Sequence, residues 1–274
     1  MRHALLAAVL LLMSLPALAA DFPPAQLIKV GRAYTDKGEH DKAIGVLKDA
    51  LKQEPKNAEA LYLLGLAYSR KEDLKSAAEA LEKSIAIDPR RYDAFLLLGM
   101  SKDLSGDPKG AAEVYRQAIV KFPDKPDAHR ELGGSLMLSG DAAAAAKEYE
   151  AANKLLPGQA DILTDWGYAL VHSKKCEEGL KVLKEAESED RRSADIASNL
   201  GDAHACLGHT DEAIASYEKA VKGNAKNGKA WFHLGLMKSK KGDAEGAKAA
   251  LEKAIALEPE NAKAKEALER VGRK

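Results

Sequence analysis

The side chains best able to do chemistry, two cysteines and three histidines, fall within one short stretch of the sequence. Cys176 and Cys206 are the only cysteines among 274 residues, and His172, His204 and His209 stand close to them. Thiolate and imidazole groups are zinc ligands, whereas two thiols form a disulfide in an oxidising compartment. The spacings H-x3-C and H-x-C-x2-H match no zinc finger, so metal binding is less favoured. Two simple buried thiols are the third interpretation.

The rest of the chain carries no catalytic or phosphate-binding motif. It contains no G-x-S-x-G, no H-E-x-x-H and no glycine-rich phosphate loop. The 42 basic residues balance the 42 acidic ones, without the basic excess that is typical of nucleic-acid binding. We therefore predict that the protein is not an enzyme, uses no cofactor or metal, and does not bind nucleic acid.

The first twenty residues have the pattern of a secretory signal peptide. Arg2 precedes an apolar run at 4–15, and Pro16 is followed by the small-x-small sequence of residues 17–19. The run is shorter than the roughly 20 residues that span a bilayer. We predict a signal peptide at 1–20, a linker at 21–23, no membrane insertion after cleavage, and a periplasmic or secreted mature protein of bacterial type.

Beyond the linker, the same residue types return every 34 residues. The glycines of this column are Gly31, Gly65, Gly99, Gly133, Gly167, Gly201 and Gly235. Sixteen residues after each glycine comes a large apolar residue: Leu47, Leu81, Tyr115, Tyr149, Leu183, Tyr217 and Leu251. Small residues flank this second column, and prolines close most units. A glycine within a helix costs about 1 kcal/mol relative to alanine, so the column indicates a close helix–helix approach.

This pattern resembles the tetratricopeptide repeat (TPR), a 34-residue helical hairpin. The resemblance implies an all-α fold, a right-handed α-solenoid of seven hairpins with a C-terminal capping helix. The expected repeats occupy 24–57, 58–91, 92–125, 126–159, 160–193, 194–227 and 228–261, and the capping helix occupies 262–274.

The hairpins are the elements that must position the cysteines. Cys176 begins the second helix of the fifth repeat, and Cys206 ends the first helix of the sixth. Because stacked hairpins bring these two ends to one edge, we predict a disulfide between them. These two repeats are also the least regular: Arg191 and Ala225 replace the closing proline, and Lys174 replaces the glycine of the turn. We interpret these departures as drift in a tolerant scaffold.

The resemblance also implies that partners bind on a concave face formed by the first helices. The residues predicted to line this groove are Ile28, Arg32, Tyr62, Leu66, Leu96, Met100, Arg130, Met137, Tyr168, Phe232 and Leu236. This surface is largely apolar, which is typical of an interaction site, although burial between hairpins is the alternative. Acidic residues recur at the second position of five repeats: Glu59, Asp93, Asp127, Asp161 and Asp195. Stabilisation of the helix dipole explains them first, and attraction of a basic segment second.

These features together predict a protein–protein interaction scaffold or adaptor in the bacterial cell envelope. It would bind a peptide or a helix of a partner in the concave groove. The alternative is a non-catalytic regulatory or structural subunit of an envelope enzyme or export complex.

Overall fold

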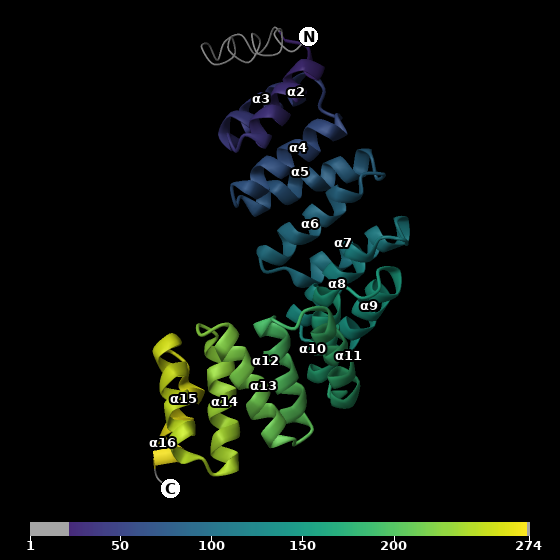
Figure 1. Cartoon of the computed structure of the whole chain (residues 1–274). Helices are drawn as coiled ribbons and strands as arrows, with labels where there is room; N and C mark the ends of the chain where they lie inside the picture. The colour runs from purple at the N-terminus through teal and green to yellow at the C-terminus, as the bar shows by residue number, and fades with distance from the viewer. Residues whose placement is uncertain (1–21, 273–274) are drawn as a thin grey trace. The chain divides into compact units, whose positions relative to one another are not determined.

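The computed structural model describes residues 22–272, and all of the secondary structure in this range is helical (Figure 1). The predicted signal peptide and residue 21 of the linker lie outside the described residues. The chain divides into two compact units, Met1–Ser135 and Leu136–Lys274, with the division inside the fourth expected repeat. We describe each unit by itself.

Unit 1 contains three complete hairpins and most of a further helix. Its helices are α2 (Pro24–Asp36), α3 (His40–Gln53), α4 (Ala58–Arg70), α5 (Leu74–Ile87), α6 (Tyr92–Leu104), α7 (Pro108–Lys121) and α8 (Pro126–Leu138), of which the last three residues belong to unit 2.

Unit 2 contains the second helix of the fourth hairpin, three complete hairpins and a final helix. Its helices are α9 (Ala142–Leu155), α10 (Ala160–His172), α11 (Cys176–Glu189), α12 (Ala194–Cys206), α13 (Thr210–Gly223), α14 (Gly228–Lys241), α15 (Ala244–Leu257) and α16 (Ala262–Gly272). No helix between residues 22 and 272 is long and apolar enough to cross a membrane.

The turn inside each hairpin depends on one residue in the left-handed region. Five of these residues are glycines, but Glu72 and Lys174 adopt the same conformation, with φ of 63° and 68°. An aspartate then caps the second helix in several repeats, as Asp107 does by accepting a hydrogen bond from the backbone N–H of Gly110 at 2.9 Å. The turn geometry therefore survives where its preferred residue is missing.

The glycine column lies under the large apolar column of the second helix. A Cβ atom added at Gly201 would stand 2.5 Å from the Tyr217 ring, and one added at Gly65 would stand 2.6 Å from Leu81 Cγ. Both Tyr217 and Leu81 are fully buried. Each glycine thus makes room for a large side chain. The backbone of the second helix also comes close, because a Cβ atom added at Gly65 would stand 3.2 Å from the carbonyl oxygen of Ala77.

Within each unit the first helices of successive hairpins pack directly against one another. In unit 1, α4 contacts α2 and α6; in unit 2, α12 contacts α10 and α14. The second helices pack between the hairpins and complete the core, as Ile214 and Tyr217 of α13 do with Leu234 of α14. The first helices therefore form a layer within each unit, and the layer of unit 2, made by α10, α12 and α14, holds the candidate site.

Candidate functional site

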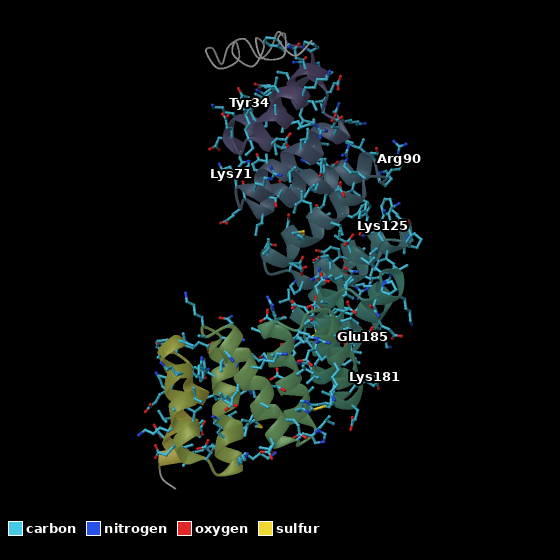
Figure 2. The ribbon with its side chains drawn as sticks, in the orientation of Figure 1. Tyr34, Lys71, Arg90, Lys125, Lys181 and Glu185 are labelled. Carbon is cyan, nitrogen blue, oxygen red and sulfur yellow. A yellow bond between two sulfur atoms is a disulfide. The ribbon has the colours of Figure 1, made fainter. Side chains whose placement is uncertain are left out.

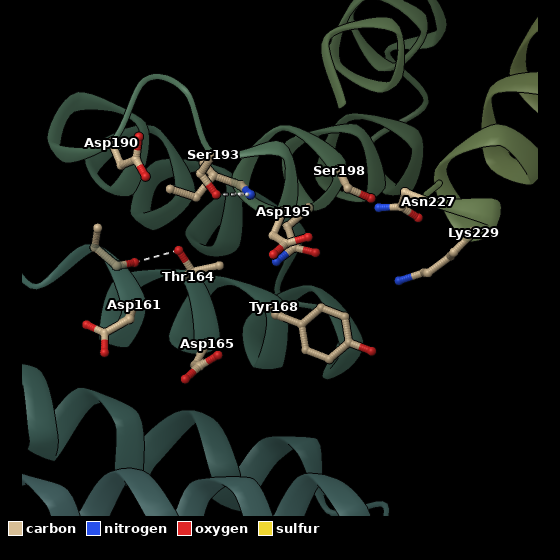
Figure 3. Close-up of a pocket in the computed structure, with 13 residues that line it drawn as sticks. Asp161, Thr164, Asp165, Tyr168, Asp190, Ser193, Asp195, Ser198, Asn227 and Lys229 are labelled. Carbon is tan, nitrogen blue, oxygen red and sulfur yellow. Dashed lines mark hydrogen bonds between the residues drawn. The ribbon is translucent and has the colours of Figure 1, made fainter. Parts of the chain in front are cut away.

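A cavity of about 580 Å³ in unit 2 opens on the layer of first helices (Figure 3). Polar side chains dominate its lining. The residues that line it are Ala160, Asp161, Thr164, Asp165, Tyr168, Asp190, Ser193, Asp195, Ile196, Ser198, Asn199, Asn227 and Lys229. They come from α10, from the turn before α12, from α12, and from the start of α14.

Local helix chemistry fixes several of these side chains. Ser193 is the N-cap of α12 and accepts a hydrogen bond from the Ile196 N–H at 3.3 Å. Asn227 caps α14 in the same way, accepting from the Ala230 N–H at 2.9 Å. Thr164 donates to the Ala160 carbonyl, so its hydroxyl is already satisfied. The capped N-termini of α12 and α14 therefore form part of the rim of the cavity.

A chain of charged and aromatic groups borders the cavity. Lys229 Nζ forms an ion pair with Asp202 Oδ2 at 2.9 Å and also lies 5.1 Å from the centre of the Tyr168 ring. Tyr217 donates its hydroxyl hydrogen to Asp202 Oδ1 at 2.7 Å. The Tyr168 ring stacks at a tilt on His172, with centroids 3.9 Å apart. Three first helices are thus connected through side chains at the site.

A second hollow of about 290 Å³ adjoins this chain and is lined by His172, Asp202, Cys206, Tyr217 and His233, among others. His233 stacks on Tyr217, with ring centroids 5.7 Å apart. Burial lowers the pKa of His233 below its ordinary value. Burial, together with the Asp202 charge and hydrogen bond, raises the pKa of Tyr217. Both groups are therefore neutral at physiological pH.

Of the two cysteines predicted to pair, Cys206 lines the second hollow. The structure joins Cys176 and Cys206 as a disulfide, seen as the yellow bond in Figure 2, with Cα atoms 6.1 Å apart. It connects the start of α11 to the end of α12, in successive hairpins. The neighbouring His204 is half-buried with its Nδ1 atom unpaired, and burial lowers its pKa. Within residues 22–272, no group of His, Cys, Asp and Glu is arranged to hold a metal ion.

The residues predicted to line the groove have different surroundings in unit 1. Ile28 is buried in the core, and Arg32 forms an ion pair with Glu59 at 2.5 Å. The Tyr62 ring is half-buried under the guanidinium of Arg91, 4.6 Å from its centre. Met100 is exposed, whereas the remaining predicted residues of this unit are half-buried: Leu66, Leu96 and Arg130.

In unit 2, Tyr168 lines the cavity of about 580 Å³, while Met137, Phe232 and Leu236 are half-buried outside it. The acidic series of the sequence supplies Asp161 and Asp195 to this cavity, but the predicted apolar groove includes none of the Ser, Thr and Asn residues around Tyr168. The usable signal was the run of Asp, Ser and Asn on α10, α12 and the start of α14, including Asp195, Ser198 and Asn199. The cavity is therefore more acidic and polar than the predicted apolar groove.

Family comparisons agree with this geometry. Models described as "Tetratricopeptide repeat" match residues 96–160, 164–228 and 199–237, and also 58–91 and 228–261; a model described as "TPR repeat" matches 31–72. The chain belongs to the tetratricopeptide repeat family. TPR repeats generally mediate protein–protein interactions, and TPR proteins bind protein partners. Among curated proteins, none matches this sequence.

Several solved structures share the TPR fold. A tetratricopeptide repeat protein from Parabacteroides merdae is 17% identical with a TM-score of 0.69, covering 91% of this chain and 98% of its own. A chain of the APC/C hetero-tetramer Cut9–Hcn1 is 18% identical with a TM-score of 0.66 over 90% of this chain, which spans only 48% of that chain. YrrB, described as a TPR protein with an unusual peptide-binding site, is 20% identical with a TM-score of 0.55, covering 70% of this chain and all of its own.

Proposed function

We propose that this TPR protein is a non-catalytic scaffold or adaptor that binds a segment of a partner protein on its layer of first helices. The observation that carries this proposal is the cavity of about 580 Å³ on that layer in unit 2, lined by side chains of three successive hairpins. Such a cavity suits an extended segment or one turn of a helix, because polar groups on its rim pair with a ligand backbone.

We further propose that the protein acts in the bacterial cell envelope, in the periplasm. The signal-peptide pattern of residues 1–20 supports this compartment, and a disulfide between Cys176 and Cys206 is compatible with it. N-terminal sequencing of the mature protein from the native host tests it: a start at residue 20 or 21 is expected. A chain that keeps residues 1–20 and stays in the cytoplasm contradicts the compartment.

Photo-crosslinking in the native host tests the binding face. A photoreactive amino acid replaces Tyr62 in unit 1 or Tyr168 in unit 2, and mass spectrometry identifies the adducts. A dominant adduct from these probes supports docking on the first helices. Adducts that form only from probes on second helices contradict docking on the first helices. If the crosslinked partner is an envelope enzyme or an export protein, the alternative role of an accessory subunit is supported.

A further inference from the structure

The cavity of unit 2 has a strong excess of acidic groups. Four aspartates line it against one lysine, Lys229, whose ammonium is already paired with the Asp202 carboxylate. Asp161 and Asp165 have polar interactions of their own, and Asp190 accepts the Arg192 N–H at 2.9 Å. Asp195 is exposed in the first turn of α12, so its carboxylate is the one best placed to receive a charge from a ligand.

A largely buried serine of the same cavity has no hydrogen-bond partner among the described residues. Ser198 is 4% exposed and lines the cavity, and no hydrogen bond of its hydroxyl occurs within residues 22–272. Other buried hydroxyls of first helices donate to the carbonyl four residues earlier, as Ser101 does to Leu97 at 2.7 Å. The Ser198 oxygen is not among the fully buried unpaired atoms of the described residues, so it reaches the cavity, where it can pair with a ligand group.

An aromatic ring lines the same cavity as these two residues. Figure 3 shows Tyr168 on α10 and Asp195 on α12 at opposite sides of the cavity, with Ser198 on the same side as Asp195 and nearer to Asn227. The ring already attracts one cation, because Lys229 Nζ lies 5.1 Å from its centre. A cation between a carboxylate and an aromatic ring is stabilised by both, and an anion there would be repelled by the aspartates.

We propose that the cavity of unit 2 binds a basic segment of an extended polypeptide. A lysine or arginine side chain of the partner lies between Asp195 and Tyr168, and a backbone group of the same segment pairs with the Ser198 hydroxyl. The inference rests on the proposed binding function and specifies the chemistry of the ligand.

Fluorescence anisotropy with the purified chain tests this assignment. The probes are a fluorescein-labelled peptide of alternating lysine and serine and its counterpart of alternating glutamate and serine. We expect the lysine peptide to bind and the glutamate peptide not to bind. Asp195→Asn should weaken binding of the lysine peptide about threefold to tenfold, and Ser198→Ala about twofold to tenfold.

The control variant is Asp93→Asn. Asp93 occupies the same position in α6 that Asp195 occupies in α12, but it lies in unit 1, outside the cavity. Its substitution should leave the affinity unchanged, and circular dichroism should show all three variants folded. Equal losses for Asp93→Asn and Asp195→Asn, or equal affinity for the two peptides, overturn the proposal.

Two further outcomes also contradict it. If the purified chain self-associates and Asp195→Asn abolishes this self-association, the cavity is occupied by a second copy of the chain, through its C-terminal helix that carries lysine and arginine. An acidic or neutral segment crosslinked to Tyr168 would overturn the basic ligand and leave the scaffold function standing. A crosslinked segment carrying lysine or arginine, lost in Asp195→Asn, supports the inference.

Discussion

Substitution of Gly201 by alanine should destabilise unit 2, although alanine is the better helix former. The added Cβ would lie 2.5 Å from the Tyr217 ring, which is fully buried and donates its hydroxyl to Asp202. A rigid ring cannot rotate out of the way as the end of a flexible side chain would. Relief of the overlap therefore requires the ring or α12 to move.

The magnitude follows from three contributions. Overpacking of a core costs about 1–3 kcal/mol, and the loss of a hydrogen bond to a charged group costs about 1.5–3 kcal/mol. Replacement of glycine by alanine within a helix returns about 1 kcal/mol. We expect Gly201→Ala to lower the free energy of unfolding by about 2–4 kcal/mol.

Gly45→Ala provides the matched control. Gly45 lies in the interior of α3, is exposed, and an added Cβ there meets no atom within 4 Å. This variant should be stabilised by about 0.5–1 kcal/mol. Urea denaturation followed by circular dichroism measures both. A Gly201→Ala protein as stable as the Gly45→Ala protein would refute the close approach of Tyr217 as the reason for the glycine column.

Three further predictions concern unit 2. Lys174→Gly should raise the free energy of unfolding by about 1 kcal/mol, because it relieves a left-handed backbone at φ 68°; a lower urea midpoint would contradict this. The bond between Cys176 and Cys206 closes a loop with a sequence separation of 30, so reducing agent should lower the free energy of unfolding by about 2–4 kcal/mol and leave a double serine variant unaffected. Mass spectrometry of alkylated, unreduced protein that finds two free thiols would refute the bond. Burial lowers the pKa of His204 and His233 below 6.5 in the folded state, so the unfolded chain binds protons more readily and stability is lost as pH falls below 6.5. The urea midpoint, followed by tryptophan fluorescence, should decrease when the pH is lowered from about 7.5 to about 5.5. The decrease should be smaller in a His204→Gln/His233→Gln variant, and an equal decrease in the two proteins would contradict the assignment.

The repeat period predicted the helices because one residue pattern dictates the same hairpin each time. First helices begin at the first residue of each expected unit, as α10 does at Ala160 and α12 at Ala194. The irregular fifth and sixth repeats keep this geometry: α11 ends at Glu189 and α13 at Gly223, although proline follows neither helix. These helices therefore end at the expected positions without the closing proline, and α13 does so at Gly223 and Asn224, residue types that are common at helix C-termini.

The character of the cavity could not be predicted in the same way. Column positions indicate which side chains face the inner layer, but not which of them are covered. Ile28 occupies a groove column and is buried, whereas Thr164 occupies the same column, is half-buried and lines the cavity. The difference depends on the side chains of neighbouring hairpins, such as Asn227 and Lys229, which lie far along the sequence.

The most direct test of the central claim compares crosslinking from the two faces of one hairpin. The photoreactive probe replaces Tyr168 on α10, which lines the cavity, or Lys181 on α11, which is exposed on the second helix (Figure 2). A specific partner adduct from Tyr168 and none from Lys181 is the predicted result. The same adduct from Lys181 alone would contradict docking on the layer of first helices.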